Sequence, residues 1–577
     1  MDATGNNSTP VFFKNKETFS FMIDREKGII TPSACTAESA DQSIKIFLNG
    51  VIYDHTGEQL IAAFSSRGVE YIRNVEGSFV IFLIVDQTQF FILTDKVNSK
   101  KAFYANLDNI WYVSNDIDSL PLQKCHLSID GIACYLANGV MLNDLTLFQE
   151  IHPANRAGIS SFKNAEVTVS SYWDFQHDSS SSSILDKARS QAELGSLMID
   201  SVKRRCDTTA DLALSLSAGK DSRGILGILS DKIRAPRLTC FSYSLTADPP
   251  GDSDAFLSRE LAAHSGYPHQ VIVSYSGNLI DLLIANARQG KCLANFCDEL
   301  DAWHQLALAH RFSDIFVGDE CFGWLDASYD TKEDIINSVY IVGASGIRWL
   351  EPFLSKDIHR QVRQCLEKLT DDIFDRARTT PDPHDKRDFL YLDQRVNHVL
   401  MPWREHFLSQ VGWVHNPYLD GSILDFMKKV PPQLRRNKSL FYETMRAMFP
   451  GLYSIPRAAS TGTRVDWQAE FSRHKDSLIS LVQQAESRLD GIISKEEIVD
   501  LIRRQDSPLL KAKVFLAKAL KYIGKRNRFA DRVFTLLLGP RIYQKNRNID
   551  PVLLLLRLLL IRIYLTPSAC VPARPRR

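Results

Sequence analysis

The residues best suited to chemistry form a short loop, Ser217-Ala218-Gly219-Lys220-Asp221-Ser222, between two apolar segments. Leucines alternate with other residues from Leu212 to Leu216, which predicts a strand. An apolar run from Ile225 to Leu229 predicts the first turns of a helix. A small-residue loop between a strand and a helix presents backbone N–H groups to an anion. We therefore expect phosphate groups to bind at Ser217, Ala218, Gly219, Lys220, Asp221 and Ser222.

Asp221 is the acidic residue of this loop. A carboxylate repels phosphates, so its most useful role beside them is to ligate a bound Mg2+ ion. The loop lacks the Gly-Lys-Ser/Thr ending of a Walker A motif. Taken alone, these six residues also fit an ordinary turn between a strand and a helix.

Length and composition exclude several classes of protein. The chain has 577 residues, 44% hydrophobic and 24% charged, which is typical of a soluble protein with more than one domain. A net charge of +1 gives no global field that would attract nucleic acid. Ten scattered cysteines include no Cys-X-X-Cys pair, and residues 1–20 contain no apolar signal core. We expect a cytoplasmic protein with reduced thiols and no transmembrane span.

The pattern of apolar runs divides the chain into a β-rich half and an α/β half. Runs of strand length recur from Thr18 to Ser114, with one helical stretch near Glu58–Ser66, which predicts a layered β domain. After residue 186, helical and strand patterns alternate through Arg237–Ser244 and Pro268–Val273. That alternation predicts a parallel sheet with ligands at the carboxyl ends of its strands.

Several motifs resemble those of one enzyme family. The loop at residues 217–222 is similar to the Ser-Gly-Gly-X-Asp-Ser loop of the ATP pyrophosphatases, with Ala218 in place of the second residue's glycine. Other matches, in chain order, are Asn49–Tyr53 with Asn-Gly-Glu-Ile-Tyr, Val75–Val80 with Leu-X-Gly-X-Phe-Ala, and Val414–Asp420 with Arg-X-Pro-Phe-Leu-Asp. Together they resemble the glutamine-dependent asparagine synthetases and their relatives, over roughly residues 40 to 465.

We expect an α/β fold in four parts, of which the resemblance implies the two domains and the composition indicates the linker and the C-terminal extension. The first, residues 1–178, would be an αββα domain like a class II glutamine amidotransferase. A Ser-rich linker, residues 179–185, would lead to an asparagine synthetase-like ATP-pyrophosphatase domain with a parallel sheet, residues 186–540. A basic, apolar extension, residues 541–577, would follow.

The resemblance also implies that the first domain has lost the glutaminase reaction. In the family the nucleophile is a cysteine exposed when Met1 is removed, and its α-amine acts as the base. Residue 2 here is Asp2, and the nearest cysteine in the sequence is Cys35. We expect this domain to serve as a structural platform.

A second candidate loop is Phe312–Gly323, which is similar to Ser-Gly-Glu-Gly-X-Asp-Glu-X-Phe-Gly-Gly of the family but three residues shorter. Because of the deletion, Asp319 matches either of two acidic positions, one a second Mg2+ ligand and the other a base or orienting residue. The resemblance implies catalytic roles for Asp319 and Glu320, and Mg2+ ligation by Asp221 and Asp319. The backbone around Leu216, Tyr243, Val317 and Gly318 would hold ATP. The alternative is that the two carboxylates cap a helix N-terminus.

One functional residue of the family has no counterpart at its expected place. The family shows Arg-X-Lys-X-Gly where this chain has Pro456–Gly462. Its lysine stabilises negative charge on the reacting intermediate. The resemblance leaves Arg457, or Arg464, as the substitute.

The resemblance implies an ATP-dependent ligase that adenylates a small-molecule or peptide carboxylate and transfers it to an amine. A substrate amine, rather than ammonia from glutamine, would make the chain similar to β-lactam synthetases and lasso-peptide cyclases. A cyclase would work with a leader-binding protein and a protease. The alternatives are an asparagine synthetase and a non-catalytic relative.

The C-terminal segment carries two further alternatives. Val552–Leu565 is apolar except for two arginines, and it is too short and too charged to span a bilayer. It predicts either a helix packed on the domain or one lying on an anionic membrane surface. The basic stretch Arg503–Arg532 predicts a solvated helix face or a surface for an acidic partner.

Overall fold

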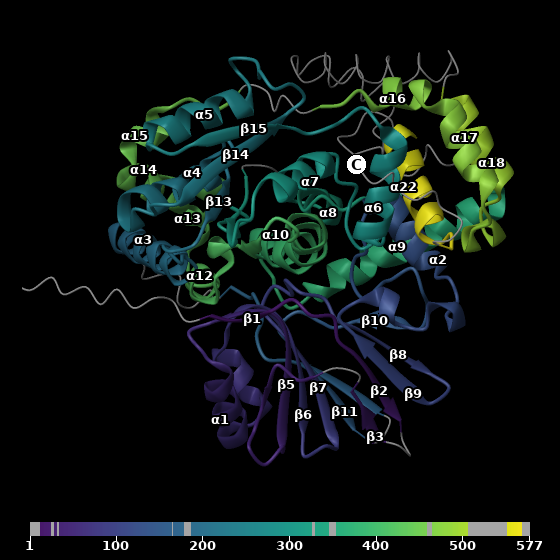
Figure 1. Ribbon diagram of the computed structural model, residues 1–577, viewed down its shortest axis with the longest axis horizontal. Helices are drawn as coiled ribbons and strands as arrows, with labels where there is room; N and C mark the ends of the chain where they lie inside the picture. Colours follow the sequence, from purple (N-terminus) through teal and green to yellow (C-terminus); the bar gives the residue numbers. More distant parts are fainter. Residues whose placement is uncertain are drawn as a thin grey trace, which may run out of the picture.

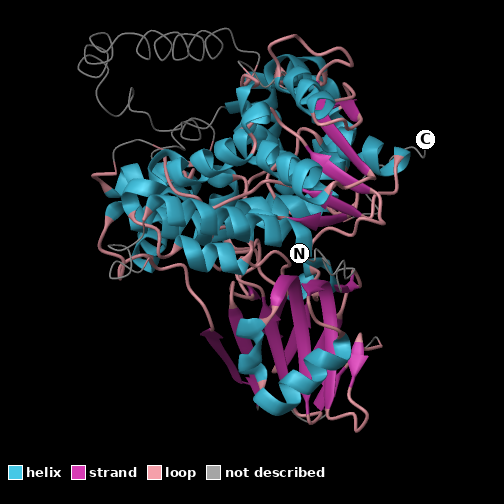
Figure 2. Ribbon diagram, turned by 90° about the vertical axis from the view of Figure 1, so that its left-hand side faces the viewer, coloured by secondary structure: helices cyan, strands magenta, loops and turns pink. Residues whose placement is uncertain are grey.

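The computed structural model describes residues 12–24, 28–31, 34–163, 166–177, 186–325, 329–344, 354–458, 464–505 and 551–567. A β-rich part lies below a larger helical part that contains a third sheet (Figures 1 and 2). The expected linker 179–185 and most of the basic stretch beyond residue 505 lie outside the described residues.

The β-rich part contains two antiparallel sheets. One has the strand order β1-β5-β6-β7-β11-β12, with β4 also paired to β5, and the other has the order β10-β8-β9-β2-β3. The strands of the first are β1 (Phe12–Asn15), β4 (Ala37–Glu38), β5 (Ile44–Tyr53), β6 (Glu76–Val85), β7 (Gln89–Thr94), β11 (Gly158–Lys163) and β12 (Glu166–Ser171). Those of the second are β2 (Ser20–Asp24), β3 (Gly28–Ile30), β8 (Phe103–Leu107), β9 (Ile110–Ser114) and β10 (Ile151–Pro153).

Helices cover the outer faces of both sheets. Phenylalanines fill the space between the sheets, among them Phe21, Phe47 and Phe82. Helix α1 (Gly57–Arg67) and the 3-10 turn η1 (Val69–Asn74) cover the seven-stranded sheet. Helix α2 (Ile129–Asn138) packs against the five-stranded sheet from the other side. The layers are therefore αββα, as expected.

The third sheet is parallel throughout, with the order β15-β14-β13-β16-β17. Its strands are β13 (Leu212–Ser215), β14 (Leu238–Ser244), β15 (His269–Val273), β16 (Asp314–Phe316) and β17 (Trp413–His415). One face packs on helices that include α3 (Lys187–Arg204) and α4 (Lys220–Gly227), and the other on α6 (Leu279–Gly290) and α7 (Leu300–Ala309). Helix α5 (Asp254–His264) connects β14 to β15. The predicted α/β fold class is thus confirmed.

A long helical rod crosses the molecule between the parallel sheet and the β-rich part. It consists of α10 (Pro383–Leu390), the π-helix η6 (Tyr391–Leu400), α11 (Met401–Trp403) and the π-helix η7 (Arg404–Leu408). Pro402 lies inside the rod and has no N–H to bond to a preceding carbonyl, which favours a change of helical register there. Extended π-helix is rare and often marks functional positions.

The remaining helices complete the upper part. They are α8 (Lys332–Ser338), α9 (Lys356–Arg376), α12 (Gly421–Met427), α13 (Pro432–Arg435), α14 (Ser439–Met448), α15 (Pro450–Ser454), α16 (Trp467–Arg473), α17 (Lys475–Gln484), α18 (Lys495–Arg504) and α22 (Pro551–Tyr564).

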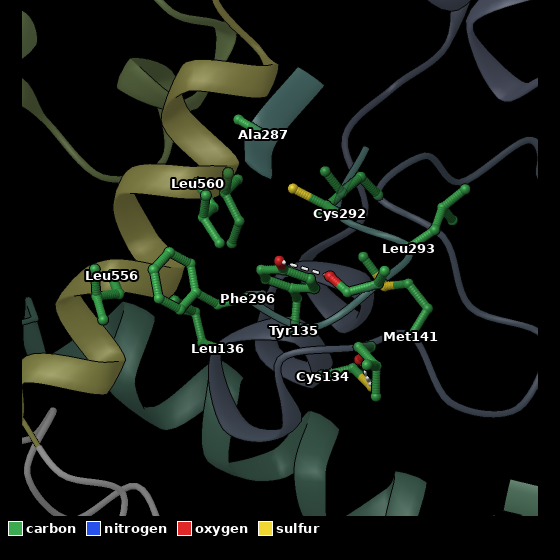
Figure 3. Close-up of a cluster of buried hydrophobic side chains, with 14 of the residues drawn as sticks. Cys134, Tyr135, Leu136, Met141, Ala287, Cys292, Leu293, Phe296, Leu556 and Leu560 are labelled. Atoms are coloured by element: carbon green, nitrogen blue, oxygen red, sulfur yellow. Dashed lines mark hydrogen bonds between the residues drawn. The ribbon is translucent and has the colours of Figure 1, made fainter. Parts of the chain in front are cut away.

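Helix α22 lies in the interior, against α2 and α6 (Figures 1 and 3). It is apolar on all sides because it is buried on all sides. Arg557 donates hydrogen bonds to the carbonyls of Leu136 and Ala137, the last turn of α2, at 3.0 and 2.6 Å. This is the packed alternative of the two expected for the segment. In the described part of the chain, no helix combines the length and apolarity needed to cross a bilayer.

Replacing Leu556 with alanine should destabilise the protein. Leu556 is fully buried in α22, and a buried Leu→Ala change costs about 2–5 kcal/mol because it loses apolar contacts and leaves a cavity. Leu308→Ala is the matched control, since Leu308 is 89% exposed. We expect Leu556→Ala to lower the melting temperature and Leu308→Ala to leave it unchanged. Equal melting temperatures would contradict the role of α22 in the core.

Candidate active site

The loop at residues 217–222 joins β13 to α4 and is curled by its own hydroxyl groups. The Ser222 hydroxyl accepts from the Ser217 N–H and donates to the Ser217 carbonyl, both at 3.0 Å. The N–H of Gly219 donates to the Ser217 hydroxyl at 3.3 Å. Two tyrosines, Tyr453 and Tyr418, donate to the carbonyls of Lys220 and Asp221 at 2.7 and 3.2 Å. The loop is therefore held from both ends.

Ala218, which stands where the family has glycine, is buried, and its backbone makes two hydrogen bonds. Its N–H donates to Asp254 Oδ1 at 3.0 Å, and its carbonyl accepts from Arg223 Nη2 at 2.9 Å. Its methyl group is therefore accommodated by the fold. The cost is that one backbone N–H of the loop already has a carboxylate partner.

Positive charge lies behind and beside the loop. Arg223 is buried, and all its hydrogen bonds in the described structure go to backbone carbonyls, those of Ala218, Leu452, Ile455 and Pro456. Lys220 lies over the ring of Tyr442, 3.5 Å from its centroid. Burial and the proximity of Arg457 lower the pKa of Lys220. Cations with few carboxylate partners around a loop favour the binding of an anion.

Two carboxylates and one lysine meet in front of the loop. Lys438 forms an ion pair with Glu320, and its Nζ lies 3.9 Å from Asp221 Oδ2. Burial and the Glu320 carboxylate raise the pKa of Asp221 to about 7. Burial would lower the pKa of Lys438, but Glu320 and Asp221 raise it well above its ordinary value. The lysine thus stays charged between two acids that repel each other.

Asp319 is placed differently from its neighbour Glu320. Its carboxylate forms a two-pronged ion pair with Arg404, at 2.8 and 2.9 Å, and accepts from Asn416 at 2.8 Å. Burial alone would raise the pKa of Asp319, but Arg404 and Asn416 lower it below its usual value. Of the expected pair of metal ligands, Asp221 therefore faces Glu320, while Asp319 is engaged by an arginine.

The carboxylates near the loop fit a metal ion whose remaining ligands would come from a bound phosphate and from water. Asp221 Oδ1 is buried and has no hydrogen-bond partner. Within the described residues, no three His, Cys, Asp or Glu side chains form a metal site by themselves. Mg2+ often takes only one or two protein carboxylates and completes its shell with phosphate oxygens and water. Asp221 supplies one carboxylate with a free oxygen, and Glu320, which accepts from Lys438 and from the Phe322 N–H, is the second carboxylate nearby.

The other expected residues lie at the carboxyl edge of the parallel sheet, apart from Arg457. Leu216, Tyr243 and Val317 end or follow β13, β14 and β16. The Val317 N–H donates to the carbonyl of His415, which continues the strand pairing. Arg457 is exposed in the segment after α15, and Arg464 is also exposed. The sheet therefore brings together every expected nucleotide-binding position.

Lys438 lies in the candidate site but was not among the predicted site residues. It precedes α14 in a left-handed conformation, with φ +55°, which aims it at the acidic pair rather than along the helix. It belongs to a basic stretch, Arg435, Arg436 and Lys438, that follows two prolines. Its partners Asp221 and Glu320 are far away in the sequence, so that stretch alone does not reveal the contact.

Gly318 allows the two loops to approach each other. A Cβ atom there would lie 3.1 Å from the backbone nitrogen of Ser222 and 3.3 Å from the carbonyl carbon of Asp221. Gly318→Ala should therefore push the loop at residues 217–222 away. If that loop binds ATP as the resemblance implies, kcat/KM for ATP should fall about tenfold, since small displacements of binding groups slow catalysis strongly. Gly251→Ala is the control, because a Cβ there meets nothing within 4 Å. An unchanged kcat/KM in steady-state kinetics of the first variant would contradict this.

One family model matches part of the chain. Residues 193–299, which include most of α3, then β13, the loop at residues 217–222 and β14, match the family model described as asparagine synthase. No curated protein matches the chain.

Similar solved structures include two enzymes. One is described as glutamine phosphoribosylpyrophosphate (PRPP) amidotransferase from B. subtilis complexed with ADP and GMP, with 7% identity, 44% of this chain and 84% of that chain covered, and a TM-score of 0.21. The other is described as the allosteric regulatory enzyme of purine biosynthesis, with 8% identity, 44% and 74% covered, and a TM-score of 0.19.

Proposed function

We propose that the chain, whose residues 193–299 match the asparagine synthase family model, is an ATP-dependent carbon–nitrogen ligase that joins a carboxylate to an amine. The observation that carries the proposal is the approach of Glu320 and Lys438 to Asp221, in the loop at residues 217–222, at the carboxyl edge of the parallel sheet. Such an edge is where open α/β sheets bind ligands.

The proposed reaction has two steps. A substrate carboxylate oxygen attacks the α-phosphorus of ATP, the bond to the β-phosphate oxygen breaks, and pyrophosphate leaves. The amine then attacks the acyl carbon, loses a proton and expels AMP. The curled loop at Ser217–Ser222 and Lys220 would hold the pyrophosphate, while the buried Arg223 would add positive charge behind the loop. Lys438 would offset negative charge that develops at the acyl group.

Mg2+ is part of the proposal. Asp221, with its free Oδ1, and Glu320 would hold the ion against the phosphates. When bound, Mg2+ supplies positive charge that neutralises the phosphate oxygens. Asp319 would act at a distance, by fixing Arg404 and Asn416 beneath the loop that carries Glu320.

The amine is proposed to come from a substrate rather than from glutamine. All nine cysteines in the described residues are free, and burial raises the pKa of every one of them, which disfavours the reactive thiolate. A peptide that carries both the carboxylate and the amine would be closed into a macrolactam, as in lasso-peptide cyclases. A leader-binding protein and a protease would then be its partners. The family match also favours a second candidate, an asparagine synthetase that uses aspartate and ammonia.

Pyrophosphate release from ATP tests these proposals. The purified protein is supplied with ATP and Mg2+ and, in separate reactions, with precursor peptides, with aspartate plus ammonium, or with aspartate plus glutamine. We expect release that requires a peptide, ignores glutamine and stops when EDTA removes divalent ions. Release with aspartate and ammonium would select the asparagine synthetase, and no release together with no ATP binding would select a non-catalytic relative.

A further inference from the structure

A second polar cavity lies at the seam between the β-rich part and the helical rod. Its volume is about 200 Å3, and its lining includes Lys16, Lys101, Lys291, Asn49, Asp116 and Glu405. None of these residues belongs to the phosphate loop or its acidic pair. The cavity is therefore a separate site, and the proposed ligase reaction gives it no role.

Two of its three lysines lack an acidic partner. Lys291 is paired with Asp116 at 2.5 Å and with Asp118 at 3.0 Å. Lys101 donates to the amide oxygen of Asn397, and Lys16 donates to the carbonyls of Ser409 and Gly412 at 3.0 and 3.3 Å. Among the described residues, no carboxylate lies within 4 Å of either amine.

The carboxylate of Glu405, which lies near these lysines, is already paired with another cation. Glu405 also lines the cavity, but it forms an ion pair with Lys100, which comes from the segment next to Lys101. Lys291 and Lys100 are thus paired with Asp116, Asp118 and Glu405. Lys16 and Lys101 remain as amines whose hydrogen bonds go to neutral oxygens.

Burying such amines costs free energy. Burial lowers the pKa of Lys101 to about 7, and burial together with Lys100 lowers that of Lys16 to about 8. An isolated ammonium in a poorly solvated site is unfavourable, and a nearby negative charge restores its charged form. A negatively charged occupant would remove this cost.

We propose that this cavity binds a small anion, a carboxylate or a phosphate group, between Lys16 and Lys101. Sites for drug-sized ligands occupy about 300 Å3 or more, so this cavity suits a ligand smaller than a nucleotide. Glu405 follows Arg404, the residue that holds Asp319, so the anion would lie beside the rod that also serves the candidate active site.

Isothermal titration calorimetry of the full chain tests the proposal. Inorganic phosphate, pyrophosphate, aspartate and glutamine are titrated separately at constant ionic strength. We expect phosphate, pyrophosphate or aspartate to bind, with an affinity that falls about tenfold or more in Lys101→Met and in Lys16→Met, because each removes a charged donor. Whether phosphate or aspartate binds more tightly identifies the source of the anion.

Four further variants separate this cavity from other sites. Lys101→Arg keeps the charge and should keep most of the binding. Lys163→Met changes an exposed lysine of the same β-rich part and should change nothing. Ser222→Ala and Gly318→Ala alter the phosphate loop, so binding lost in these variants but kept in Lys101→Met would place the anion there and overturn the proposal. Binding of glutamine but of no anion would also overturn it.

These results are independent of the ligase reaction. A chain that releases no pyrophosphate from ATP would still show the lysine-dependent binding if the cavity is an anion site. Conversely, an active ligase whose anion binding is unaffected by Lys101→Met and Lys16→Met would leave the proposed function standing and contradict the cavity.

Discussion

Asp221→Asn will lower the rate of pyrophosphate release about 10²–10³-fold, the loss typical when one preorganised charge-stabilising group is removed from a reaction centre. The change keeps the size of the side chain and removes the negative charge that faces Lys438 and carries the unpartnered Oδ1. The proposed Mg2+ site would lose one of its two carboxylates. Single-turnover measurement of pyrophosphate release, at saturating and at low Mg2+, reports the effect.

The matched control for this variant lies at the opposite end of the same strand. Asp211 precedes β13, is exposed and pairs with Arg237 at 2.8 Å on the surface. Asp211→Asn should leave the rate unchanged, because exposed ion pairs contribute little. If both variants release pyrophosphate at the wild-type rate, the loop at residues 217–222 is not the reaction centre.

Arg404→Met will destabilise the protein by about 3–5 kcal/mol, the cost of breaking a buried ion pair by removing one partner. The Asp319 side chain is 9% exposed, and without Arg404 its charge is left with Asn416 as its partner. In the wild type, Arg404 keeps the pKa of Asp319 below its ordinary 3.8. This contribution is therefore present above pH 3.8 and is lost as the pH falls through the lower, folded value.

Denaturant unfolding at pH 7 measures this change. Arg378→Met is the control, because Arg378 is exposed and has no ion pair among the described residues. A wild-type midpoint for Arg404→Met would show that Asp319 is not held by this arginine. Asp319 would then be available as the metal ligand that the family resemblance implies.

The two acidic residues of the second loop show what the sequence could and could not predict. The strand at residues 314–316 and the polar loop after it follow from a local pattern, so the position of Asp319 and Glu320 at the sheet edge was predictable. Neighbouring residues in a non-helical loop point in different directions, and which one faces Asp221 depends on Arg404 and Lys438. These partners lie 85 and 118 residues further along the chain.

Features that depend on adjacent residues were predictable, and features that depend on distant residues were not. The loop at residues 217–222 with its flanking strand and helix belongs to the first kind, because its sequence pattern is local. The apolar helix at residues 551–564 has a pattern compatible with a core or a membrane surface, and only the faces of α2 and α6 decide between them. Lys438 was not predicted as a site residue, because its contacts with Asp221 and Glu320 depend on a left-handed backbone conformation between two helices and on residues far apart in the sequence.

The buried position of α22 has a consequence for how the protein is made. Arg557 caps α2 from 421 residues away in the sequence. During synthesis, α2 and α6 emerge long before the helix that completes their shared core, so their apolar faces stay open until residue 564 has left the ribosome. Such late, distant contacts slow folding and expose the nascent chain to aggregation and to chaperones. The chain expressed without residues 551–564 should accordingly be recovered mainly as insoluble protein.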